Sequence, residues 1–141
     1  MASSDLLLRL DNATLEWLDS EGQRSGQTRS ELAEALIDEA LRMQAHPGIV
    51  FRPGPAGRRP ALAFGPDIWE FARVVQAVEG TEDETIEKIA EFTFLTPDQA
   101  RVALGYYVEY RDEIDEWIRL NDEEIERARV AWLRERALLK A

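Results

Sequence analysis

Carboxylates are the residues of this sequence that could most readily do chemistry, and they gather in two runs. The runs cover residues 112–116 and 122–126. On a helix, Asp112, Asp115 and Glu116 would share one face, which would suit acid–base catalysis or binding of a divalent cation. A run of this kind more often forms a solvated helix face. We therefore expect these runs to hold neither a catalytic residue nor a metal ion.

Other residue types that support catalysis are scarce. The chain contains no cysteine, which excludes a disulfide scaffold, a thiolate metal site and a thiol nucleophile. His46 is the single histidine, so a metal site made of several histidines is excluded as well. No glycine-rich phosphate loop, dinucleotide fingerprint or zinc-ligand spacing occurs. These features predict a protein that is not an enzyme and that uses no cofactor.

The chain is strongly acidic but carries two short basic segments. Its net charge of −11 argues against indiscriminate binding to nucleic acid or to anionic membranes. Residues 46–65 contain three arginines and no acid, and residues 127–141 contain four arginines and a lysine with one acid. Each segment is either ordinary solvated surface or a local contact site.

A length of 141 residues suits one ordinary domain or two small ones. No apolar run approaches the ~18 residues of a membrane span, and the N-terminus lacks the pattern of a secretion signal. We expect a cytoplasmic protein without membrane contact. Its fold is expected to be mainly α with little β, organised as residues 1–45, 46–120 and 121–141.

The first module is predicted to contain one short strand and two helices. Residues 6–10, Leu-Leu-Leu-Arg-Leu, predict the strand, and a short helix follows that ends at a polar break over residues 22–26. Thr28 and Glu31 have the spacing of a capping box, which would open the second helix.

A single strand is not stable by itself, because it leaves half of its backbone groups without partners. The simplest remedy is a second copy of the chain, whose strand would pair with the first as an antiparallel ribbon. The inward-facing leucines of each strand would then be buried beneath the ribbon. We expect a homodimer formed through Leu6, Leu8 and Leu10.

This module resembles the ribbon-helix-helix family, in which a two-stranded ribbon reads the major groove of DNA. The strand at residues 6–10 and Gly-Gln-Thr-Arg-Ser-Glu-Leu at residues 26–32 carry the resemblance. It implies base contacts from the outward face of the strand and phosphate contacts at the start of the second helix. The implied DNA-binding residues are Leu7, Arg9, Thr28, Arg29 and Ser30. The alternative is a ribbon that serves dimerisation alone.

The middle of the chain is predicted to form a β-hairpin and three helices. The hairpin would pair residues 49–52 with residues 61–64 across a turn rich in proline and glycine. Helices are expected over residues 67–78, after a capping box at residues 81–84, and after a further box that begins at Thr96. Tight joints between these helices favour a compact helix-turn-helix-like bundle.

The middle module resembles a small bacterial domain family whose members are commonly antitoxins paired with PIN-like nuclease toxins. The resemblance is carried by His-Pro-Gly-Ile-Val at residues 46–50, Gly-Arg-Arg-Pro at residues 57–60, and Leu-Thr-Pro-Asp-Gln-Ala through Tyr-Tyr over residues 95–107. Together, the two resemblances make the chain similar to VapB-type antitoxins of type II toxin–antitoxin systems. They imply neutralisation of a PIN-like ribonuclease by protein binding, and repression of the protein's own operon by a dimer on operator DNA.

The helix that begins after Thr96 does not obviously end. It either runs unbroken to Lys140 or gives way to a new helix capped by Asn121. Residues 121–141 carry an apolar stripe flanked by arginines, which suits a groove on another protein. The alternative is that this arm packs against its own bundle or against a dimer mate.

The arm is also the part of the chain expected to bind a toxin. The resemblance implies a toxin that holds a metal ion with acidic side chains, and such a site would attract a basic segment. Arginine is suited to the contact because its guanidinium pairs with a carboxylate through two hydrogen bonds. The predicted toxin-binding residues are Ile125, Arg127, Arg129, Trp132, Leu133, Arg134 and Arg136.

Two other functions are compatible with the sequence. One is a stand-alone ribbon-helix-helix transcriptional regulator, whose C-terminal part serves only dimerisation or ligand binding. The other is a dimeric protein adaptor that does not bind DNA. Co-purification of a small nuclease would separate the antitoxin from both.

Overall fold

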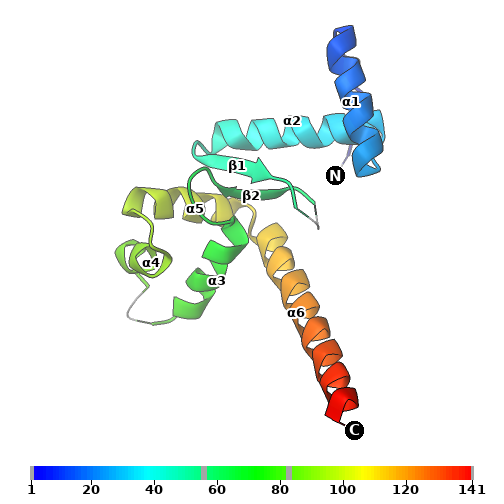
Figure 1. Cartoon of the computed structure of the whole chain (residues 1–141). Coiled ribbons are helices and arrows are strands. Elements are labelled where there is room, and N and C mark those ends of the chain that lie inside the picture. Colours follow the sequence, from blue (N-terminus) through cyan, green and yellow to red (C-terminus); the bar gives the residue numbers. More distant parts are fainter. Residues whose placement is uncertain (1, 55–56, 82–83, 141) are drawn as a thin grey trace. The chain divides into compact units, whose positions relative to one another are not determined.

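The protein is described from a computed structural model that places residues 2–54, 57–81 and 84–140 (Figure 1). This part of the chain contains six helices and two strands. The chain divides into two compact units, Met1–Arg42 and Met43–Ala141. The predicted class, mainly α with little β, is confirmed.

The first unit contains two helices, α1 (Asn12–Ser25) and most of α2 (Arg29–Ala45). α2 opens with the predicted capping box. The Thr28 hydroxyl accepts a hydrogen bond from the Glu31 amide at 3.1 Å, and the Glu31 carboxylate accepts one from the Thr28 amide at 3.3 Å. The buried apolar side chains of the two helices are Leu18 and Leu32.

The predicted break over residues 22–26 is wrong, because α1 continues through it to Ser25. A Cβ on Gly22 would stand 2.7 Å from the carbonyl oxygen of Gln27. Glycine at this position therefore permits a close approach between the last turn of α1 and the backbone that follows the helix. The helix ends where Gly26 takes the left-handed conformation, with φ at 72°.

Residues 2–10 have no regular secondary structure in the single chain. Leu6, Leu7 and Leu8 are exposed, and Leu7 is 98% accessible. A strand in this segment needs a partner for its backbone groups, which only a second chain would supply in the predicted arrangement. The ribbon of two chains accordingly stays a prediction.

The second unit begins with a hairpin of β1 (Ile49–Arg52) and β2 (Arg59–Leu62). The two strands are antiparallel, with Ile49 opposite Leu62. The predicted second strand, residues 61–64, begins and ends two residues too late. The chain turns after Leu62, because the Gly65 amide donates to the Leu62 carbonyl at 3.2 Å.

Three helices follow the hairpin: α3 (Ile68–Val78), α4 (Ile86–Thr93) and α5 (Pro97–Glu109). α5 has the capping box expected from the sequence. The Thr96 hydroxyl accepts from the Gln99 amide at 3.1 Å, and the Gln99 side chain accepts from the Thr96 amide at 2.9 Å. Pro97 occupies the first helical position, where a missing amide hydrogen costs nothing.

The capping box predicted at residues 81–84 is wrong. α4 begins later and is capped by Thr85, whose hydroxyl accepts from a first-turn amide at 3.2 Å. The Thr81 hydroxyl donates instead to the Val78 carbonyl at 2.6 Å, at the end of α3. Residues 82–83 of the predicted box lie outside the described residues.

The chain bends at Tyr110 and continues as α6 (Arg111–Lys140). Both sequence alternatives are therefore wrong: the helix that follows Thr96 is broken before Lys140, and α6 runs without interruption through Asn121. Tyr110 leaves helical geometry with φ at −115° and ψ at 36°, and its ring lies 4.6 Å from the ring of Tyr106. The bend allows α5 and α6 both to contact α3.

The hairpin and the helices of the second unit enclose one hydrophobic core. Its largest fully buried side chains are Ile68, Phe71, Tyr106 and Ile114. His46 packs beside this core, with its ring 5.2 Å from the Tyr106 ring and its Nε2 2.6 Å from the Glu109 carboxylate. In the described part of the chain, no helix has the length and apolar composition needed to cross a bilayer.

Candidate protein-interaction site

α6 extends beyond the elements that bury its first turns (Figure 1). Ile114 and Ile118 are buried in the core, and their helical face continues along α6 with Ile125 and Trp132. Ile114 is 1% exposed, whereas Ile125 is 53% and Trp132 is 52% exposed. One apolar stripe therefore begins inside the second unit and ends on its surface.

The second half of α6, residues 125–140, combines this apolar stripe with positive charge. Residues 131–140 are all exposed, and Leu133 is among them. Between residues 127 and 140 there are five basic side chains and one acid. Apolar side chains gathered on a charged, exposed helix are typical of a surface that contacts another protein.

The continuous helix divides the predicted toxin-binding residues between two faces. At 100° per residue, Ile125, Arg129, Trp132 and Arg136 lie on one face. Arg127 and Arg134, seven residues apart, lie on the opposite face, and Leu133 lies at the side. The seven residues therefore form two candidate surfaces and not one.

Local partners already hold the arginines of the first face. Arg129 donates to Glu126 at 2.7 Å, and this contact lowers the pKa of Glu126 and raises that of Arg129. The Arg136 guanidinium lies 5.1 Å from the centre of the Trp132 ring, within cation–π range. For Arg127 and Arg134, no ion pair or hydrogen bond is found among the described residues.

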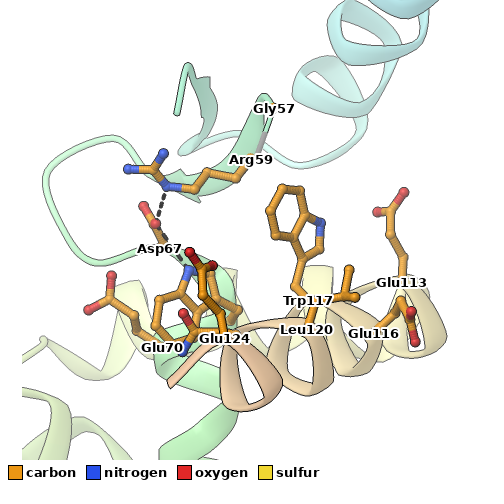
Figure 2. A pocket seen from close by; sticks show the side chains of 11 residues that line it. Gly57, Arg59, Asp67, Glu70, Glu113, Glu116, Trp117, Leu120 and Glu124 are labelled. Carbon is orange, nitrogen blue, oxygen red and sulfur yellow. Dashed lines mark hydrogen bonds and ion pairs between the residues drawn. The ribbon is translucent and has the colours of Figure 1, made fainter. Parts of the chain in front are cut away.

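The first half of α6 borders a groove of about 580 Å³ within the second unit. Its apolar lining comes from Trp69 at the start of α3 and from Trp117 and Leu120 on α6. Figure 2 shows Arg59 reaching from β2 toward Asp67, with Trp117 and Leu120 across from it on α6. The hairpin, α3 and α6 together therefore form the walls of this groove.

The groove is strongly acidic. Five carboxylates line it, together with one guanidinium, that of Arg59. Asp67 is buried and paired with Arg59, and it also accepts from the Trp69 indole nitrogen at 3.2 Å. The other four carboxylates belong to Glu70, Glu113, Glu116 and Glu124. No ion pair or hydrogen bond of Glu70 or Glu124 is found among the described residues.

Members of the acidic run at residues 112–116 have hydrogen-bond partners within the second unit. Asp115 accepts from the Tyr107 hydroxyl at 2.6 Å and from the Gln76 amide at 3.0 Å. Burial, together with this contact to Asp115, raises the pKa of Tyr107. Glu116 is bound to Arg119 one turn along the helix. No group of three or more acidic or histidine side chains is placed for a metal ion in the described ranges.

The basic segment at residues 46–65 is part of the packing of the hairpin. Arg52 donates to the carbonyls of Gly65 at 2.9 Å and Leu62 at 2.8 Å, and to a third carbonyl at 3.2 Å. These bonds join the Arg52 side chain to the carbonyls at the end of β2 and in the turn that follows it. Arg52 therefore stabilises the turn after β2.

The predicted DNA-binding residues all belong to the first unit and are exposed. Leu7 and Arg9 lie in the segment without regular structure. Thr28 is engaged in capping α2, and Ser30 lies in the first turn of this helix. Arg29 forms two hydrogen bonds with Asp19, at 2.8 Å and 2.7 Å, and this contact lowers the pKa of Asp19.

The groove tryptophans are the site residues that sequence reasoning missed. Trp69 and Trp117 are only partly buried, although each packs against the core of the second unit. A signal for Trp117 was available, because it lies between acidic residues on a helix, where a tryptophan that faces only the core would be unusual. Trp69 gave no such signal, since its exposure depends on where α6 packs.

Neither a family model, nor a curated protein, nor a solved structure matches this chain. The function is therefore inferred from the surfaces of the chain itself. Two of them stand out: the exposed basic half of α6 and the acidic groove beside its first half. Both are suited to binding protein.

Proposed function

We propose that this protein is an antitoxin that binds and neutralises a PIN-like ribonuclease, and that the second half of α6 is the segment that binds it. One observation carries the proposal: the apolar stripe of α6 leaves the core and continues, exposed, beside arginines. The resemblance of residues 46–107 to antitoxin domains supports the choice of a nuclease as the partner.

The chemistry of the contact follows from charge. A nuclease that holds its divalent ion with carboxylates has a negative active site, which repels most of a chain with a net charge of −11. The second half of α6 is the exception. Ile125 and Trp132 would enter an apolar groove of the nuclease, and Arg129 or Arg136 on the same face would pair with its carboxylates. Such a pairing would exclude the metal ion.

The first unit would supply DNA binding and dimerisation. In the proposed ribbon, Leu6, Leu8 and Leu10 of two chains are buried together, and Arg9 with Leu7 faces the base edges. The start of α2 would contact a phosphate through free amides. Arg29 would join this contact only by sharing or leaving its pairing with Asp19.

The tail is tested by co-expressing the chain with the nuclease encoded beside its gene. Removing residues 127–141 takes away the exposed basic turns and leaves the packed part of α6 intact. We expect the truncated protein to lose co-purification and inhibition of the nuclease. Full inhibition by the truncated protein would overturn the proposal. It would mean that another part of the second unit covers the active site of the nuclease.

A matched pair of variants identifies the face that binds. The double variant Trp132→Ala, Arg136→Glu changes the stripe face, and Arg127→Glu, Arg134→Glu changes the opposite face of the same helix. We expect the first to reduce nuclease binding at least about tenfold, which corresponds to 1.4 kcal/mol. The second variant is the control and should bind nearly as the original protein does.

DNA binding and dimerisation need separate tests. Arg9→Ala should weaken binding to the upstream region of the gene and relax its sequence preference, whereas Arg29→Ala should weaken all sequences alike. In a chain that lacks residues 127–141, so that only the ribbon can join two copies, Leu8→Asp should abolish the dimer, as measured by analytical ultracentrifugation. If the original protein does not shift its own upstream DNA at low salt, the protein is an adaptor and not a repressor.

A further inference from the structure

One face of α6 is acidic over its first half and basic over its second half. Starting within the groove, its residues follow at three- or four-residue spacing: Glu116, Leu120, Glu124, Arg127, Ala131 and Arg134. They therefore lie on a single helix face. In this series two glutamates precede two arginines, with Leu120 and Ala131 as the apolar or small side chains between them.

A chain cannot join these two halves by itself. α6 is continuous from Arg111 to Lys140, so each residue lies about 1.5 Å further along the axis. Arg134 is then roughly 20 Å beyond Leu120 along the helix axis, out of reach of the groove of its own chain. The basic half could reach an acidic groove only on another molecule.

We propose that the basic half of α6 docks antiparallel into the acidic, tryptophan-lined groove of a second copy of this chain. An antiparallel two-fold arrangement fills both grooves at once, because each copy offers one groove and one basic half. Arg134 then lies near Glu116 of the second copy, and Arg127 near Glu124. Ala131 faces Leu120, where its small side chain permits close approach of the two helices.

The occupant is identified by charge and by what the single chain leaves unpaired. The groove has five carboxylates and one guanidinium, whereas residues 127–140 have five basic groups and one acid. Glu124 in the groove, and Arg127 and Arg134 on the tail, have no ionic partner among the described residues. A second copy of the same helix face would bring an arginine to Glu124 and a carboxylate to each of Arg127 and Arg134.

This docking is independent of the proposed function. It uses the face of Arg127 and Arg134, and it leaves the opposite face, with Ile125 and Trp132, accessible. It is also separate from the ribbon expected in the first unit. Self-association of α6 would therefore survive loss of the ribbon, and it would hold even if no nuclease binds.

The test uses full-length chains and the absence of native cysteine, which lets single cysteines report one contact. One preparation carries Leu120→Cys and a second, with a different tag, carries Ala131→Cys. After mixing and mild oxidation, a disulfide between the two is expected as the main product on a non-reducing gel. Two preparations that both carry Leu120→Cys serve as the control for a parallel arrangement and should link poorly.

Charge exchange then tests whether the two halves recognise each other. Glu116→Arg with Glu124→Arg should reduce the 120–131 disulfide about tenfold or more, and Arg127→Glu with Arg134→Glu should do the same, since each places like charges opposite each other. Combining all four substitutions restores opposite charges and should restore the disulfide. All four residues are exposed, so the fold should tolerate the changes.

Three results would overturn the proposal. The first is the absence of a 120–131 disulfide in the original charge background. The second is equally efficient linking of two Leu120→Cys chains, which would indicate parallel helices. The third is a fourfold variant that links no better than the double variants, which would mean that the basic half of α6 binds a different protein.

Discussion

The two halves of α6 belong to one uninterrupted helix, yet the structure uses them in opposite ways. The first half buries Ile114 and Ile118 in the core, and Arg73 of α3 pairs with Asp122 near its end. The second half buries none of its large apolar side chains, although Ile125 and Trp132 continue the same stripe. Helical periodicity therefore indicates which residues share a face, but not whether anything covers that face.

Charge separates the two halves as clearly as burial. The acidic runs lie at residues 112–116 and 122–126, whereas residues 127–140 hold five basic groups and one acid. A net charge averaged over the chain hides this division. A local concentration of positive charge on an otherwise acidic chain favours contact with an acidic surface, as expected of a segment that docks on another molecule.

The largest expected difference comes from two isoleucines on the shared stripe. Ile114→Ala should lower the free energy of unfolding by about 2–5 kcal/mol, because it opens a cavity in a packed core. Ile125→Ala, made on the exposed half, should change it by less than about 0.5 kcal/mol. Urea unfolding at low protein concentration, followed by circular dichroism, measures both. Equal losses would mean that the second half of α6 is packed in solution.

A second contrast sets a packed arginine against a tail arginine. Arg52→Met removes the donors to three turn carbonyls and should cost about 1.5–3 kcal/mol, since charged groups make the stronger hydrogen bonds. Arg134→Met is the matched control, with no such bonds in the described residues. Its unfolding midpoint in urea should stay unchanged. If Arg52→Met and Arg134→Met unfold at the same urea concentration, Arg52 does not stabilise the turn.

The polar anchor of the first half predicts a smaller effect that depends on pH. Tyr107→Phe removes one buried hydroxyl from its contacts with Asp115 and Gln76, at a cost of about 1 kcal/mol. The pKa of Tyr107 is raised in the folded protein, chiefly by burial. Its contribution is therefore complete below the unfolded value of about 10 and is lost as pH rises through the folded value.

Unfolding measured between neutral and strongly alkaline pH checks this expectation. The difference in stability between the original protein and Tyr107→Phe should be constant up to about pH 10 and should shrink above it. A difference that stays constant across the whole range would show that Tyr107 does not ionise differently in the folded and unfolded chain.

The smallest effect is expected for the exposed pair of Glu126 and Arg129. Glu126→Gln should leave the unfolding midpoint unchanged, because solvent screens a pair of this kind. Arg129 holds the pKa of Glu126 below its usual value, so the pair persists as pH falls through the normal glutamate range and is lost below it. Helicity by circular dichroism in acid, compared between the two proteins, measures the difference. A large loss at neutral pH would mean that the tail helix depends on this pair.

The sequence by itself determined the features that depend on near neighbours. The capping boxes at Thr28 and Thr96 were predictable because each bond joins residues three apart. The hairpin and its first strand were predictable from the turn residues between two apolar segments. The apolar stripe and the basic character of residues 127–140 can likewise be read directly from spacing and composition.

Only the tertiary structure decided which of these features meet. The bend occurs at Tyr110, whose ring packs against Tyr106, and no proline or glycine at this position predicts it. Arg52 and Arg127 look alike in the sequence, but one is held by turn carbonyls and the other is not, because the carbonyls come from residues 10 to 13 positions away. The groove has the same origin: the hairpin, α3 and α6 form it only once all three pack on one core, since local propensity carries no information about contacts between distant segments.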